Sequence, residues 1–323
     1  MDNLRISFLQ SGGFITNYSC SSKCKHCLYN CSPSRNKSYA DENTVRAMLE
    51  VVKRFGCNSL HIGGGEPFLR SHKLLKILTV FQKENVAVDY IETNSSWYQN
   101  HKEAKSLLKE IMHRGVNTLL ISISPFHNEY IPFIKVKGVI KACKETGMNV
   151  FPWVMNFYNE IDTLGEELCH ESSEYIKAFG NDYFKNIPGR YWIHFGGRAI
   201  ETYSKVYPLK KTEEILSNIG CKELYDTSHF HIDLYGDYIP GLCTGLAIPA
   251  NALGTEISED RFPVLSILTR EGIRGLLSFA KHAVKFKPND EYLNKCHLCN
   301  HIRKVLFESS KSYRELQPEG YYM

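Results

Sequence analysis

The sequence has no long apolar run, no secretory signal and little net charge. No window of its 323 residues approaches the ~20 consecutive apolar residues of a membrane-spanning helix. The start, MDNLRISFLQSGGF, lacks the basic and then apolar pattern of a signal peptide. Lys and Arg outnumber Asp and Glu by 39 to 35, and a net charge of +4 is too small to predict nucleic-acid binding. These absences predict a cytoplasmic protein without membrane or nucleic-acid partners.

Cysteine, in contrast, is abundant. The chain has 11 cysteines, an odd number that does not fit a disulfide framework. In a reducing compartment, closely spaced cysteines are more often metal ligands. Cys57, Cys143 and Cys169 are expected to pack as small apolar side chains. The cysteines that form two separate candidate ligand groups are Cys20, Cys24 and Cys27, and then Cys221, Cys243, Cys296 and Cys299.

Strand-like and helical segments alternate through residues 1–208. The strand-like runs are Phe14–Ser19, Ser59–Gly63, Val86–Thr93, Thr118–Ser124, Asn149–Asn156 and Tyr191–Phe195. The helix-period segments between them are Asp41–Phe55, Leu69–Gln82, Glu103–Arg114 and Lys135–Thr146. Strands that alternate with helices predict an α/β fold with a parallel sheet of βαβ units. Six strands are fewer than the eight of a complete barrel, so a partial barrel is expected.

Residues 209–323 have a different composition and are predicted to form a smaller α+β domain. A helical stretch, Leu209–Ile219, comes first. His229–Pro240 then reads as a hairpin that turns at Gly236-Asp237. A long helix over Leu265–Val284 and a Cys-x-x-Cys pair complete this unit. The boundary at residue 208 is set by this change in pattern alone.

Cys20, Cys24 and Cys27 follow the first expected strand with the spacing C-x3-C-x2-C. A structural zinc site needs four ligands, and three thiolates leave that set incomplete. An iron–sulfur cube held by three cysteines keeps one iron open for an added ligand. At the carboxyl end of a barrel strand, such a cube lies where the βα loops build active sites. The alternative is a zinc site in which Cys31 supplies the fourth ligand.

This spacing, together with Gly63-Gly64-Gly65-Glu66-Pro67 after the second strand, resembles the radical S-adenosylmethionine (SAM) superfamily. The resemblance implies a partial (β/α)6 TIM barrel in which Cys20, Cys24 and Cys27 hold a [4Fe–4S] cluster whose open iron binds SAM. In this family, one electron from the reduced cluster cleaves SAM to a 5′-deoxyadenosyl radical, which abstracts hydrogen from a substrate C–H bond. A flavodoxin- or ferredoxin-like electron donor is implied as a partner.

The resemblance also implies which residues contact SAM. The segment expected to bind the methionine ammonium is Gly64, Gly65, Glu66 and Pro67, whose glycines allow the backbone to approach a ligand closely. His26 stands where the family has an aromatic or apolar residue and would pack against adenine. Further candidates near the cofactor are Asn94, Ser122, Ser124 and Arg198. Each of these residues also has a structural alternative. His26 could face solvent, the serine hydroxyls could bond to the backbone, and Arg198 could be a surface arginine.

The second group of cysteines resembles the Twitch domain, a shortened SPASM module that holds one auxiliary [4Fe–4S] cluster. The implied ligands are Cys221, Cys243, Cys296 and Cys299. One feature departs from the module, because its usual spacing counted from Gly236 ends on Gly241, two residues before Cys243. Cys243 is therefore either a ligand or a free thiol that donates hydrogen to a substrate radical, as in peptide epimerases of the superfamily. A zinc site built from the same four cysteines is a further alternative.

The layout as a whole resembles the epimerase-like peptide modifiers most, through Thr93-Asn94-Ser95-Ser96-Trp97 and the C-terminal Cys-x-x-Cys. We expect an enzyme that abstracts hydrogen from a ribosomally made peptide, leading to epimerisation, crosslinking or oxidation. No leader-binding extension precedes Cys20, so the peptide is expected at the barrel mouth, near His127, Glu129 and Tyr130. One alternative is the dehydrogenation of a sugar or aminocyclitol alcohol. Another is a non-catalytic iron–sulfur or zinc protein.

Overall fold

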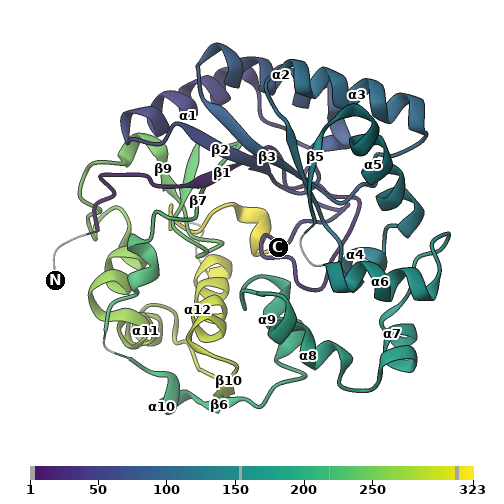
Figure 1. Ribbon diagram of the computed structural model, residues 1–323. Coiled ribbons are helices and arrows are strands. Elements are labelled where there is room, and N and C mark those ends of the chain that lie inside the picture. Colours follow the sequence, from purple (N-terminus) through teal and green to yellow (C-terminus); the bar gives the residue numbers. More distant parts are fainter. Residues whose placement is uncertain (1–3, 153–154, 218, 310–312) are drawn as a thin grey trace.

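The structure is a computed structural model that describes residues 4–152, 155–217, 219–309 and 313–323. A mostly parallel sheet lies at its centre, and helices arch over the outer side of this sheet (Figure 1). The helices of this arch are α1 (Glu42–Arg54), α2 (Ser71–Lys83), α3 (His101–His113) and α5 (Phe133–Thr146). The expectation of an α/β fold with a partial barrel is confirmed.

The main sheet has the strand order β5-β4-β3-β2-β1-β7-β8-β9. Its first five strands pair in parallel, and they are β1 (Gly12–Ile15), β2 (Ser59–Gly63), β3 (Ala87–Thr93), β4 (Thr118–Ile121) and β5 (Asn149–Pro152). The predicted strand Ser59–Gly63 matches β2, but β1, β4 and β5 end earlier than predicted. Of the predicted run Asn149–Asn156, residues 153 and 154 lie outside the described residues. Residues 16–35, which follow β1, leave the sheet and form a loop that carries Cys20, Cys24 and Cys27. We call this segment the first cysteine loop.

The predicted sixth strand, Tyr191–Phe195, is wrong. This segment has no strand structure and connects α8 (Tyr183–Arg190) to α9 (Arg198–Tyr203). The other parallel neighbour of β1 is β7 (Phe230–Asp233), from the predicted hairpin. Its Phe230 and Ile232 are fully buried, whereas Trp192 of the predicted strand is 62% exposed. The aromatic run had strand-like composition, but β7 supplies the apolar side chains that the sheet buries.

The hairpin itself is confirmed. β8 (Asp237–Ile239) pairs antiparallel with β7, and Gly236 has a φ of 82° in the turn between them. β9 (Ile248–Pro249) pairs with β8 at the edge of the sheet. Strands from residues 209–323 thus extend the sheet that residues 1–208 begin.

Residues 172–215 and 263–309 lie in the lower half of the molecule in Figure 1. The predicted helix over 209–219 is wrong, because β6 (Lys210–Lys211) and a single turn, α10 (Thr212–Ile215), occupy it. β6 instead pairs with β10 (Glu291–Tyr292) in a small antiparallel sheet. The other helices are α4 (Pro125–Asn128), α6 (Met155–Leu164), α7 (Ser172–Phe179), α11 (Pro263–Val284) and α12 (Lys295–Ser309). Four short 3-10 turns are η1 (Pro67–Arg70), η2 (Lys222–Tyr225), η3 (Ala250–Ala252) and η4 (Glu319–Tyr321).

The helix ends of the barrel follow local sequence signals. The Asp41 carboxylate accepts hydrogen bonds from the backbone N–H groups of Asn43 and Thr44 and so caps α1. Gly147 ends α5 in the left-handed conformation, with a φ of 81°, and Gly115 follows α3 with a φ of 87°. Both glycines thus end helices, as the sequence predicts.

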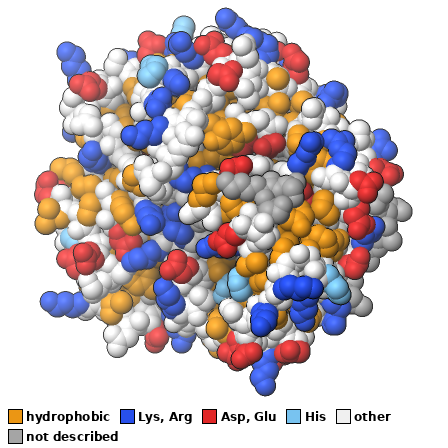
Figure 2. All heavy atoms as spheres, turned by 180° about the vertical axis from the view of Figure 1, so that it is seen from behind, with side chains coloured by type: hydrophobic (Ala, Val, Ile, Leu, Met, Phe, Trp, Pro, Cys, Tyr) orange, Lys and Arg blue, Asp and Glu red, His pale blue; other side chains and the backbone are white. Residues whose placement is uncertain are grey.

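The surface carries charges of both signs. Figure 2 shows the face turned away from the viewer in Figure 1, where acidic and basic side chains are interspersed. This mixture agrees with the small net charge of +4. Within the described ranges, no helix combines the length and the apolar character that crossing a bilayer requires.

Candidate active site

The first cysteine loop follows β1 and places its three thiols around one pocket. Cys20, Cys24 and Cys27 all line this pocket, which has a volume of about 240 Å³ and which we call the first pocket. The Asn94 amide, just after β3, lies 3.5 Å from the Cys20 sulfur and also donates to the hydroxyl of Ser22. The loop thus lies at the carboxyl ends of the parallel strands, where barrels of this kind carry their sites.

Two glycines let the segment after β2 pack directly on this loop. The Gly65 N–H donates to the Asn17 carbonyl at 2.7 Å, and the Glu66 N–H donates to the Ser19 carbonyl at 3.0 Å. A Cβ atom on Gly65 would lie only 1.9 Å from the Ser19 oxygen. The sequence suggested that these glycines allow a ligand to approach the backbone. In the structure they allow the backbone of the first cysteine loop to approach.

The Glu66 carboxylate is fully buried and is bound by its own chain. It accepts hydrogen bonds from the Phe68 N–H, the Thr93 hydroxyl and the Asn94 N–H, at 3.1, 3.0 and 2.7 Å. Burial raises the pKa of Glu66 to about 7, although these hydrogen bonds oppose the rise. Contacts within the chain thus occupy both oxygens of this carboxylate.

The thiols of the loop differ in their acidity. Burial raises the pKa of Cys20 to about 12 and also raises that of Cys24. A hydrogen bond from the Cys31 thiol lowers the pKa of Cys27 to about 6, despite burial, and Arg198 contributes to the lowering. The same hydrogen bond and burial raise the pKa of Cys31. Buried sulfurs held in one loop are a donor set suited to a soft metal centre such as an iron–sulfur cluster.

The second cysteine group also converges on one pocket, with a volume of about 320 Å³, which we call the second pocket. Its lining includes Cys221, Cys243, Cys296 and Cys299. Burial raises the pKa of Cys243, and the nearby Cys296 and Cys299 add to the rise. Cys243 lies in a turn in which its N–H donates to the Pro240 carbonyl at 3.0 Å.

Among the residues that the structure describes, no three Cys, His, Asp or Glu side chains are grouped so that they could hold one metal ion. Zinc needs all its ligands within about 2.0–2.3 Å of a single ion. In an iron–sulfur cube each cysteine binds a different iron, so the sulfurs stay farther apart.

The two pockets adjoin each other. The side chains that line both are Trp192, His194, His229 and Leu242. Burial lowers the pKa of His194 and of His229, so both imidazoles are neutral at physiological pH. The wall between the cysteine groups is therefore formed by aromatic, imidazole and aliphatic side chains without charge. A substrate bound there would lie between the two groups.

A family comparison decides the class of this site. The sequence model of the Radical SAM superfamily matches residues 14–164, which include the first cysteine loop and the segment after β2. The chain has a radical SAM domain. Members of this superfamily are enzymes that use a [4Fe–4S] cluster and SAM, and the resemblance seen in the sequence is confirmed.

A search of solved structures found matches of low similarity. Methylornithine synthase (PylB) is 14% identical over 45% of this chain and 44% of that chain, with a TM-score of 0.35. Native anSMEcpe with bound AdoMet and Kp18Cys peptide is 14% identical over 93% and 96%, with a TM-score of 0.46. BtrN in complex with AdoMet and 2-DOIA is 15% identical over 75% of each chain, with a TM-score of 0.38. A search of curated proteins gave no match.

The residues expected to contact SAM in the radical SAM domain fall into two sets. Those that line the first pocket are His26, Gly64, Gly65, Glu66, Asn94, Ser122 and Arg198. Pro67 and Ser124 are not part of its lining, because Pro67 begins η1 and the Ser124 hydroxyl pairs with Nδ1 of His127 at 2.7 Å. The His26 ring stacks on Phe126 at 4.7 Å, and its Nδ1 is buried without a hydrogen-bond partner. An unpartnered ring nitrogen at this place fits a nucleoside ligand.

The Arg198 guanidinium binds backbone carbonyl groups of the first cysteine loop. Its Nε donates to the Cys24 carbonyl at 2.8 Å, and its Nη2 donates to the Cys31 carbonyl at 2.5 Å. The guanidinium therefore fixes the first cysteine loop. Among the candidate substrate contacts, His127 lines the first pocket, whereas Glu129 pairs with Lys25.

Sequence reasoning missed four residues of the barrel interior. His231 and Glu92 line the first pocket, His229 lines both pockets, and His61 contacts His231. A signal existed for two of them, because His229 and His231 are two residues apart at the start of the predicted hairpin, where alternate residues share a face. Their position beside β1 required knowledge of the sheet order, which local sequence does not provide.

Proposed function

We propose that the protein cleaves SAM reductively and abstracts a hydrogen atom from a substrate held between its two cysteine groups. Cys20, Cys24 and Cys27 would hold the SAM-binding [4Fe–4S] cluster. When bound, the reduced cluster and SAM supply a 5′-deoxyadenosyl radical that can break a C–H bond. The observation that carries the proposal is the pair of adjoining pockets, each lined by one cysteine group. A flavodoxin- or ferredoxin-like protein would supply the electron.

The chain positions and shields these groups. Arg198 holds the carbonyls of the cysteine loop, and the Gly65 backbone anchors that loop to the end of β2. The Asn94 amide lies against the Cys20 sulfur and polarises it. Aromatic and imidazole side chains form part of the wall of the first pocket, where they would help to exclude water and protect a radical from side reactions.

We further propose that residues 209–323 bind an auxiliary [4Fe–4S] cluster through Cys221, Cys243, Cys296 and Cys299. All four thiols line the second pocket, which supports a role for Cys243 as a ligand rather than as a hydrogen donor. A ligated Cys243 would not return a hydrogen atom, and the substrate radical would then lose a second electron to this cluster. The reaction would then be an oxidation, by crosslinking or dehydrogenation, rather than an epimerisation.

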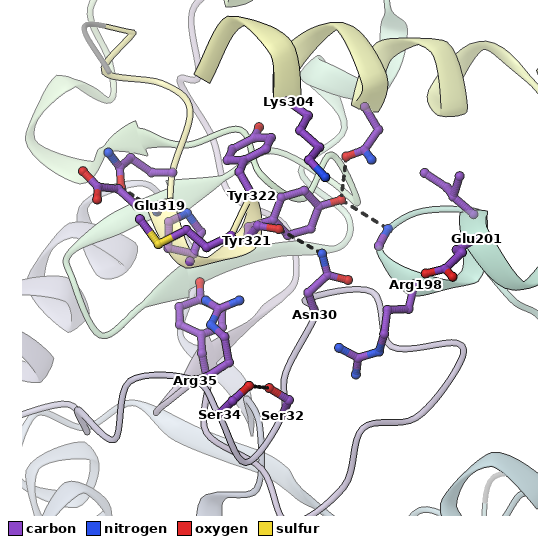
Figure 3. A pocket seen from close by; sticks show the side chains of 18 of the residues that line it. Asn30, Ser32, Ser34, Arg35, Arg198, Glu201, Lys304, Glu319, Tyr321 and Tyr322 are labelled. Atoms are coloured by element: carbon purple, nitrogen blue, oxygen red, sulfur yellow. Dashed lines mark hydrogen bonds between the residues drawn. The ribbon is translucent and has the colours of Figure 1, made fainter. Parts of the chain in front are cut away.

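A peptide is the favoured substrate because of a third, larger pocket of about 1000 Å³. In Figure 3, Asn30 and Arg35 of the first cysteine loop lie on one side of it and Lys304 of α12 on the other, with Tyr321 between them. Arg198 lines both this pocket and the first one. A polar opening of this size beside the site suits a peptide segment. The small first and second pockets favour the alternative substrate, a sugar or aminocyclitol alcohol.

Anaerobically reconstituted protein tests the proposal. With dithionite and SAM it should form 5′-deoxyadenosine, whereas Cys24→Ala should not, and Cys143→Ala, a buried cysteine outside both groups, should behave as wild type. A two-hydrogen mass loss in the product supports oxidation, and one deuterium gained from heavy water supports epimerisation. Absence of 5′-deoxyadenosine above the Cys24→Ala level would favour a non-catalytic metal protein.

A further inference from the structure

Three polar side chains inside the barrel line one pocket, and two of them have buried polar atoms without hydrogen-bond partners. Glu92 on β3, His231 on β7 and Tyr29 of the first cysteine loop all line the first pocket. Nδ1 of His231 and the Tyr29 hydroxyl are buried and have no hydrogen-bond partner. Their rings are 5.4 Å apart. Buried polar atoms are normally satisfied, so such a cluster points to a ligand.

Within the described ranges, the Glu92 carboxylate has no positively charged side chain as a partner. The closest basic group is Nε2 of His61, at 4.0 Å. Burial lowers the pKa of His61 to about 3, so this imidazole is neutral and does not balance the carboxylate. No Lys or Arg within the described ranges forms an ion pair with Glu92. Burial and the neighbouring Glu66 raise the pKa of Glu92 to about 7, as expected for a carboxylate without a positive partner.

The histidine pair leaves an acceptor directed away from His61. Nε2 of His231 and Nε2 of His61 are 3.2 Å apart, so one ring donates and the other accepts. Gly13 makes room for this contact, because a Cβ atom there would lie 2.2 Å from Nε2 of His61. When His231 donates from Nε2, its Nδ1 keeps a lone pair. Glu92, His231 and Tyr29 then offer three acceptor atoms on one pocket wall.

We propose that Glu92, His231 and Tyr29 bind a primary ammonium group of the substrate. An ammonium has three N–H donors and one positive charge, which match three acceptors and one unpaired carboxylate. The inference deepens the proposed function, since it rests on the substrate entering the first pocket. It names the substrate class as a primary amine, such as a lysyl side chain, a peptide amino terminus or an amino sugar.

One other ammonium could reach this wall, namely that of the methionine part of SAM. A Cβ atom on Gly63 would lie 2.8 Å from the Glu92 carboxylate, so Glu92 is near the segment implicated in SAM binding. The ammonium groups of SAM and of a substrate amine would be bound by the same contacts. The experiment therefore measures the binding of SAM and of a separate amine.

The test uses Nα-acetyl-L-lysine methylamide as the probe and its Nε-acetylated counterpart as the uncharged match. Calorimetry on anaerobically reconstituted protein with SAM should show at least ten-fold tighter binding of the amine in wild type. Glu92→Gln should reduce this preference to less than two-fold. Asp89→Asn, a carboxylate on the same strand outside the pocket lining, should keep it. No preference in wild type, or a preference retained in Glu92→Gln, would overturn the proposal.

A second set of measurements separates the possible failures. Glu92→Gln should leave the dissociation constant of SAM within two-fold of wild type. A ten-fold weaker SAM binding without an amine effect would assign Glu92 to the SAM ammonium and overturn the proposal. Should Glu92→Gln not fold, His231→Gln replaces it and should lower the amine preference at least three-fold. Failure of wild type to form 5′-deoxyadenosine while it still prefers the amine would refute the proposed function but not this subsite.

Discussion

Nε of Arg198 donates to the Cys24 carbonyl oxygen at 2.8 Å, which ties the start of α9 to a loop 174 residues earlier in the chain. Nη2 of the same guanidinium binds the Cys31 carbonyl. One side chain therefore holds both ends of the segment that carries the last cysteines of the first group. The Cys24 carbonyl also accepts the Cys27 N–H at 3.1 Å, whereas the loss of Arg198 removes the side-chain donor of the Cys31 carbonyl.

Arg198→Ala should lower the free energy of unfolding by about 2 kcal/mol, because two hydrogen bonds to a charged donor are lost. It should also reduce the iron bound after reconstitution. Thermal unfolding and iron assays check both. The control is Arg46→Ala, which removes a partly exposed ion pair with Glu84 and should cost under about 1 kcal/mol. Equal effects of the two substitutions would contradict the role given to Arg198.

Gly65→Ala should disrupt the first cysteine loop, since its Cβ would lie 1.9 Å from the Ser19 carbonyl oxygen. Overpacking of this kind costs about 1–3 kcal/mol, and the loop must move. We expect SAM binding and iron content to fall together. The matched control is Gly189→Ala in α8, where an added Cβ meets nothing within 4 Å. That change should be neutral or stabilising by up to about 1 kcal/mol. Normal iron content in Gly65→Ala would show that the close approach is not needed.

Cys243→Ala should remove one of two clusters and so lower bound iron and sulfide by roughly half. The expectation follows from the shared pocket of Cys243 with Cys221, Cys296 and Cys299. Cys169→Ala, an exposed cysteine outside both groups, serves as the control and should retain full iron. Unchanged iron with lost product formation would instead identify Cys243 as a hydrogen donor.

The stability difference between Glu92→Gln and wild type should depend on pH. Burial raises the pKa of Glu92 from 4.5 to about 7, so the folded state binds its proton more tightly than the unfolded state. Wild type therefore loses stability relative to the Gln variant as pH rises from about 4.5 to about 7. Thermal unfolding at pH 5 and pH 8, without added amine, measures this difference. A variant that is relatively less stable at pH 8 than at pH 5 would mean that Glu92 has a cationic partner.

Local chemistry made much of the barrel predictable. Asp41 and Gly147 mark helix ends through side-chain capping and a left-handed conformation, and both signals act within a few residues. The composition of Tyr191–Phe195 is equally strand-like, yet the place beside β1 goes to Phe230–Asp233. Strand formation depends on a partner with a free edge and on buried side chains, and neither is encoded locally. The sequence therefore predicted the local elements of the barrel better than the order of the strands in the sheet.

The site shows the same limit. The spacing of Cys20, Cys24 and Cys27 is local, so the first cysteine group could be recognised from the sequence. The cluster of Glu92 and His231 arises only because β7 joins the sheet next to β1, which no spacing in the sequence reveals. Likewise, the Glu66 carboxylate is occupied by groups 27 and 28 residues away. Tertiary contacts decide which polar atoms remain available for a ligand.

Electron paramagnetic resonance of a Cys296→Ala/Cys299→Ala variant tests the central claim most directly. This variant removes two cysteines of the second group, so the signal of the reduced protein reports only the cluster held by Cys20, Cys24 and Cys27. The account predicts a [4Fe–4S]⁺ spectrum whose g values shift when SAM is added. A spectrum that SAM leaves unchanged, or the absence of a cluster signal, would contradict an open iron in the first pocket.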